Sequence, residues 1–90
     1  MLFTLTIRSN EPLWPDLEAY NGKTWKRQDS ARYGLARAVY EAMRGSALLD
    51  RPVAVRLAKW INQLELDRAP KRGQTAMNLG AGFTFILKAE

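Results

Sequence analysis

Two tyrosines and two arginines recur at helical spacing in the middle of the chain and could bind a ligand. Tyr33, Arg37, Tyr40 and Arg44 follow one another at intervals of four, three and four residues, so an α-helix would align them in one column. Arginine binds phosphates and carboxylates through two parallel hydrogen bonds, and tyrosine stacks on bases or fills pockets of a partner protein. The column therefore predicts a contact surface, but it does not distinguish nucleic acid from protein as the ligand.

The same column can also be explained without any ligand. Tyrosine is amphipathic and arginine forms helices well, so a solvated helix face could carry this pattern by chance. Alternatively, one or both tyrosines could pack beneath the segment that precedes the helix, against Trp14 or Trp25. If the column is a contact surface, Arg37→Glu with Arg44→Glu should abolish partner binding and leave thermal stability nearly unchanged, whereas a large loss of stability would show that the column is buried structure.

Two basic clusters accompany the column and extend the predicted contact surface. The first directly precedes the helix, and the second follows the next helix in a loop; they consist of Lys26 and Arg27, and of Arg68, Lys71 and Arg72. In an antiparallel helical hairpin, both clusters would meet at one end of the domain. The chain has a net charge of +5, and residues 23–72 hold twelve Lys or Arg against five Asp or Glu. This asymmetry predicts a polyanionic partner or an acidic protein surface.

The composition excludes most catalytic and metal chemistry. The chain has no cysteine and no histidine, which excludes disulfides, Cys or His zinc sites and catalytic pairs of these residues. The closest carboxylate pairs, Asp16 with Glu18 and Glu65 with Asp67, would point to different sides of a helix. Residues 80–82 lack the Lys-Ser/Thr ending of a phosphate-binding loop. We expect a protein without catalytic residues, metal or cofactor; the alternative is an enzyme that uses only Arg, Lys, Tyr and substrate positioning.

Hydrophobic periodicity predicts the elements that would position the column. An N-terminal strand is predicted where apolar and polar residues alternate from Phe3 to Ile7. A helix is predicted from Asp29 to Arg44, with Gly45 ending it in the left-handed conformation. The apolar stripe of this helix lies opposite the column and consists of Ala31, Leu35, Ala38, Val39 and Ala42, with Met43 at its margin.

Further elements are predicted on both sides of this helix. A second helix should begin after Asp50 and end by Ala69, and a C-terminal strand should run from Phe83 to Lys88. Apolar residues alternate on one face from position 77 to position 87, and the glycines at 80 and 82 indicate a bulge, a bend or a close backbone approach. Residues 14–27, which we call the arm, fit a short helix and a hairpin around Asn21-Gly22 equally well.

Together these elements predict a single α+β domain over residues 1–90. A two-helix hairpin would pack on a small antiparallel sheet formed by the N- and C-terminal strands, in the order β-arm-α-α-β. Since two strands alone make a marginal sheet, strand pairing with a second copy could complete it as a homodimer.

Two functions from different classes follow from these features. The first is a small, basic, non-enzymatic module that binds the nucleic-acid backbone through the Tyr/Arg column and the basic loops. The second is an inhibitor or adaptor that docks on a larger acidic or nucleic-acid-handling protein complex; in size and style the chain resembles the small inhibitors encoded by phages and mobile elements. No apolar run is long enough to span a bilayer and no basic leader precedes the first apolar stretch, so we expect a cytoplasmic protein without membrane contact.

Overall fold

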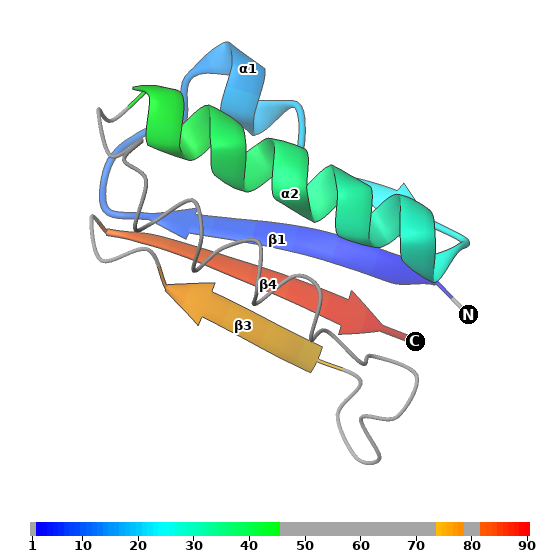
Figure 1. Cartoon of the computed structure of the whole chain (residues 1–90). Helices are drawn as coiled ribbons and strands as arrows, with labels where there is room; N and C mark the ends of the chain where they lie inside the picture. The colour runs from blue at the N-terminus through cyan, green and yellow to red at the C-terminus, as the bar shows by residue number, and fades with distance from the viewer. Residues whose placement is uncertain (1, 46–73, 79–81) are drawn as a thin grey trace.

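A computed structural model describes residues 2–45, 74–78 and 82–90, which form an antiparallel sheet with one main helix beside it (Figure 1). The elements in chain order are β1 (Phe3–Ser9), α1 (Pro15–Glu18), β2 (Thr24–Trp25), α2 (Gln28–Gly45), β3 (Gln74–Asn78) and β4 (Phe83–Ala89). The strands lie in the order β2-β1-β4-β3, and each neighbouring pair is antiparallel. This mixture of strands and helix confirms the α+β class.

The two terminal strands form the centre of the sheet. β1 and β4 pair from Phe3↔Ala89 to Ser9↔Phe83, so the predicted pairing of the N- and C-terminal strands is confirmed. Because side chains alternate between the two faces of a sheet, each strand buries every second residue. The buried residues of the two strands are Phe3, Leu5, Ile7, Phe83, Phe85 and Leu87. The other face, which we call the open face, carries exposed or half-buried side chains that include Thr4, Thr6, Arg8, Ala76, Thr84, Ile86 and Lys88.

β3 is the strand that the sequence pattern did not predict. The continuous alternation from position 77 to position 87 suggested one face of one strand, but β3 and β4 are separate strands that pair with each other, from Gln74↔Lys88 to Asn78↔Thr84. The alternation of apolar residues continues although the chain reverses direction between β3 and β4, because residues opposite each other in an antiparallel pair lie on the same face. Gly82 forms a bend with φ +83°, which is one of the three predicted alternatives, and a Cβ there would lie 2.9 Å from Nδ2 of the Asn10 side chain.

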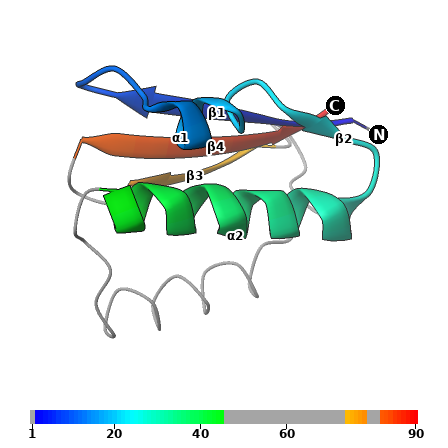
Figure 2. The ribbon, with the colours of Figure 1, turned by 90° about the horizontal axis from the view of Figure 1, so that it is seen from above.

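α2 covers one face of the sheet (Figure 2). It confirms the helix predicted from Asp29 to Arg44 and extends it by one residue at each end. All five residues of the predicted apolar stripe are fully buried, and Met43 is 1% exposed. The prediction that Gly45 leaves the helix in the left-handed conformation is wrong, because Gly45 is helical and has no positive φ. Its lack of a side chain instead makes room for Trp14.

The arm combines features of both predicted conformations. It contains the short helix α1, and Gly22 turns the chain at φ +81°, but the strand that follows pairs with β1 and not with the preceding part of the arm. The N–H of Gly22 donates to the carbonyl of Leu5 at 2.7 Å, and the N–H of Leu5 donates to the carbonyl of Lys23 at 3.0 Å. Oδ1 of Asn21 accepts from the N–H of Ile7 at 2.9 Å. The arm therefore supplies hydrogen-bond partners along the outer border of β1.

The second predicted helix, residues 51–69, lies outside the described residues, as does the basic loop with Arg68, Lys71 and Arg72. The structure thus describes one main helix of the predicted hairpin. Within its described part, no helix has both the length and the apolar character needed to cross a membrane.

Candidate functional site

The four residues of the predicted column lie on the side of α2 that is turned away from the core, and we call this surface the Tyr/Arg face. Tyr33 is 70% exposed and Tyr40 is 39% exposed, which makes them two of the three exposed large hydrophobic residues in the described part of the chain. The alternative in which these tyrosines pack beneath the arm is therefore wrong. Arg37 and Arg44 are exposed as well, but the arm holds their side chains in two different ways.

Arg37 is oriented by two aromatic side chains. Its guanidinium carbon lies 5.7 Å from the centroid of the Tyr40 ring, within the range of a cation–π interaction. Its side chain also donates a hydrogen bond to Tyr20 of the arm, and this bond is the main cause that raises the pKa of Arg37 above its ordinary value, followed by the electrostatic effect of Tyr33. No ion pair joins Arg37 to a described carboxylate. Arg37 therefore lies near Tyr20 and Tyr40 and carries a charge that no described carboxylate neutralises directly.

Arg44 is engaged by two carboxylates. Its Nη2 lies 3.0 Å from Oε2 of Glu41 and 3.8 Å from Oδ2 of Asp16. Glu41 is the one buried charged residue in the described part of the chain, and its side chain is 12% exposed. Its carboxylate therefore depends on the hydrogen bond from Arg44. The side chain of Asp16 is 72% exposed, so water can solvate that carboxylate. Arg44 thus links α2 to α1, and its charge is largely balanced within the protein.

The arm reaches α2 because two tryptophans fit against two glycines. A Cβ on Gly34 would lie 2.1 Å from Cζ2 of Trp25, and a Cβ on Gly45 would lie 2.2 Å from Cζ2 of Trp14. The Trp14 ring also meets Phe83 edge to face, with 5.7 Å between the ring centroids and 82° between the planes. Since no larger side chain fits at either glycine, these contacts place the arm beside the Tyr/Arg face.

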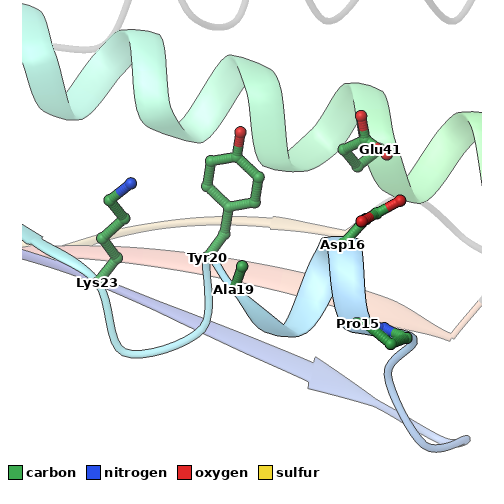
Figure 3. A pocket seen from close by; sticks show the side chains of 6 residues that line it. All are labelled: Pro15, Asp16, Ala19, Tyr20, Lys23 and Glu41. Carbon is green, nitrogen blue, oxygen red and sulfur yellow. The ribbon is translucent and has the colours of Figure 1, made fainter.

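Between the arm and α2 lies a shallow cleft of about 280 Å³ (Figure 3). Tyr20 and Asp16 point from the arm toward α2, and Glu41 faces them from the helix. Nζ of Lys23 lies 5.4 Å from the centroid of the Tyr20 ring and 6.0 Å from that of Trp25. The cleft therefore combines two carboxylates, an ammonium and a phenol. These polar groups can form hydrogen bonds with an approaching chain.

One of the two predicted basic clusters can be placed. Lys26 and Arg27 are exposed and come directly before α2, and the carbonyl of Arg27 accepts the N–H of Ala31 at 3.0 Å. The cluster Arg68, Lys71 and Arg72 lies outside the described residues, so its predicted meeting with the first cluster stays a prediction. Among the residues that the structure describes, no three acidic side chains gather closely enough to hold a metal ion.

The site also contains residues that are not in the predicted column, among them Tyr20, Asp16 and Glu41. Glu41 had a signal in the sequence, because it lies four residues after Arg37 and three before Arg44, where a carboxylate can meet either arginine on a helix. Tyr20 and Asp16 had none, since their position depends on how the arm folds back on α2.

Comparison with known proteins does not place the chain in a family. No protein-family model, no curated protein and no solved structure matches it.

Proposed function

We propose that this protein is a non-enzymatic binding module that docks on another protein through the Tyr/Arg face. The observation that carries the proposal is the exposure of Tyr33 and Tyr40 on either side of Arg37, whose guanidinium already interacts with Tyr20 and Tyr40. Tyrosine and arginine are the residue types that most often dominate binding energy at protein interfaces. A side chain that is ordered before binding loses less conformational entropy when the complex forms.

The partner that suits this surface is a protein patch with at least one accessible carboxylate. Such a group can accept the remaining hydrogen bonds of the Arg37 guanidinium, since no described carboxylate pairs with it. The exposed Lys26 and Arg27 at the start of α2 extend the positive charge beyond Arg37. A module of this kind acts as an inhibitor or adaptor, because it occupies a partner's surface without changing a substrate.

Charge compensation favours a protein partner over the nucleic-acid backbone. Binding to phosphates is driven by cations that displace counterions. At one end of the Tyr/Arg face, however, Arg44 is already shared between Glu41 and Asp16. Glu18 on α1 adds a further exposed carboxylate in the arm beside this end. The acidic side chains there would repel phosphates, whereas a protein partner can complement a surface of mixed charge.

A nucleic-acid partner is the second candidate, because the chain has a net charge of +5 and a pI of about 10.0. Its exposed cations include Lys26 and Arg27. In this case the affinity for short DNA or RNA should fall steeply as salt is raised, with several phosphates neutralised.

The test is affinity capture from a nuclease-treated lysate of the cells that naturally make the protein. Wild type, Tyr33→Ala and the control Thr6→Ala are used as baits; Thr6 is exposed on the open face, away from α2. We expect a protein that wild type and Thr6→Ala retain after nuclease treatment and that Tyr33→Ala loses. A partner that disappears with the nucleic acid, together with a steep salt dependence of DNA or RNA binding, would favour the second candidate. A partner that all three baits retain equally would rule out the Tyr/Arg face as its contact surface.

A further inference from the structure

The two outer borders of the sheet differ in how their main-chain groups are satisfied. On the side of β1 that faces away from β4, the arm provides partners: it contributes the short outer strand β2, Gly22 and Lys23 bond to Leu5, and the Asn21 side chain bonds to Ile7. At the opposite border, formed by β3, no described strand pairs on the outer side (Figure 1). A strand in this position presents N–H and C=O groups that can pair with another strand.

The hydrogen-bond pattern of the sheet shows that the main-chain groups of Ala76 point away from β4. Leu2 and Glu90 exchange two main-chain hydrogen bonds, of 2.6 Å and 2.8 Å, so they form a hydrogen-bonded pair. Because such pairs alternate along antiparallel strands, the main-chain groups of Phe85 and Leu87 point away from β1 and toward β3. The β3 residues opposite these two bond to them. Ala76 lies between those residues, so its N–H and C=O point to the outer side.

The sequence of β3 also lacks the residue types that commonly prevent pairing at a sheet edge. Its sequence, Gln-Thr-Ala-Met-Asn, contains no charged residue and no proline, and it is five residues long. The side chain of Ala76 is small and exposed. In a chain with a net charge of +5, this neutral strand is a place where two copies can approach without direct repulsion.

We infer that β3 pairs with β3 of a second copy of this chain, antiparallel and about a twofold axis at Ala76. An antiparallel pair of identical strands is self-complementary, as a closed dimer requires. The N–H of Ala76 donates to the carbonyl of Ala76 of the second copy, and the reverse bond follows by symmetry. The two sheets become one continuous sheet with both α2 helices on the same side. Both Tyr/Arg faces then point to that side, although the dimer does not depend on the function proposed for them.

Two variants test the pairing, with a control for charge. Ala76→Pro removes the outward N–H and leaves the bonds between β3 and β4 in place, since proline is tolerated where the N–H of a border strand faces solvent. Ala76→Lys places two like charges opposite each other at the twofold axis. Thr6→Lys adds the same charge to the open face, on β1, away from the β3 border. Sedimentation velocity over a range of concentrations measures dimer formation, and far-UV circular dichroism checks that each variant is folded.

We expect wild type and Thr6→Lys to dimerise with similar dissociation constants. Ala76→Pro should weaken the dimer by roughly ten- to hundredfold, because one N–H donor is lost from each copy. Ala76→Lys should weaken it as well, and it decides the question if the proline variant does not fold. A wild-type protein that stays monomeric at all concentrations would overturn the inference. So would a dimer that both Ala76 variants retain unchanged, or one that Thr6→Lys weakens as much as Ala76→Lys does.

Discussion

The contact between Gly34 and Trp25 predicts that Gly34→Ala lowers the free energy of unfolding when Trp25 is present and raises it when the Trp25 ring is removed. In an exposed helix interior, Gly→Ala stabilises by about 1 kcal/mol, because alanine loses less backbone entropy on folding. At Gly34, however, the new Cβ would lie 2.1 Å from Cζ2 of Trp25 and 2.7 Å from both Cε2 and Cη2. Ordinary contacts of this kind are 3.4–4 Å, so the ring has to move by more than 1 Å.

The magnitude follows from weighing these two effects. Overpacking of a well-fitted site typically costs about 1–3 kcal/mol, and the rigid indole ring of Trp25 puts this case toward the upper end. Subtracting the gain of about 1 kcal/mol in helix propensity leaves a net loss of about 2 kcal/mol for Gly34→Ala. For a domain of this size, that corresponds to a Tm lowered by roughly 8–16 °C.

A double-mutant cycle provides the assay. The free energy of unfolding is measured by urea titration for wild type, Gly34→Ala, Trp25→Ala and the double variant, with circular dichroism as the signal. Without the indole ring, Gly34→Ala should stabilise by about 1 kcal/mol, so its effect changes sign between the two backgrounds. If Gly34→Ala stabilises the protein in both backgrounds, or destabilises it equally in both, the packing of Trp25 on this glycine is refuted.

Four other single substitutions probe the core, the ion pair and the turns, each by the same urea titration. Phe85→Ala should cost about 3–5 kcal/mol, since this ring is fully buried in the centre of the sheet; a loss near zero would contradict its burial. Arg44→Ala should cost about 1 kcal/mol, mainly through the loss of the hydrogen bond to the mostly buried Glu41, and Glu41→Gln in the same background should recover part of this loss. Gly22→Ala should cost about 1–2 kcal/mol because of its positive φ, and Gly82→Ala should cost more because its Cβ would also meet a neighbouring side chain. Equal stability of the two glycine variants would show that this neighbour moves away without cost.

The sequence predicted the elements whose burial follows a simple period. The buried positions of β1, β4 and α2 recur at the period of each element, from Phe3 on β1 to Leu87 on β4, and Glu41 on α2 is the one charged residue among them. The period also placed the Tyr/Arg column opposite the core, where Tyr33 is exposed. The α+β class and the pairing of the terminal strands followed from these elements alone.

What the sequence could not predict depends on contacts between distant segments. β3 was missed because a hairpin and a single long strand give the same alternation of apolar residues around Phe83. Gly45 was interpreted as a helix end, whereas it is a packing position for Trp14, and this role cannot be recognised without knowing where the arm lies. For the same reason Tyr20 was not assigned to the site, although it orients Arg37. The ion pairs of Arg44 with Glu41 and Asp16 also change the expectation that Arg37→Glu with Arg44→Glu leaves thermal stability nearly unchanged, because reversing the charge of Arg44 should reduce stability.

The central claim, that the Tyr/Arg face contacts another protein, is tested most directly by photocrosslinking from that face. Tyr33 is replaced by the photoreactive p-benzoylphenylalanine, which is also aromatic, and the protein is irradiated in the cells that naturally make it. The same replacement at Thr6 on the open face serves as the control, because that position is exposed but lies on the side of the sheet away from α2. We predict a covalent adduct with a protein from position 33 and none with the same protein from position 6. An adduct with nucleic acid alone, or no adduct from position 33, would contradict the claim.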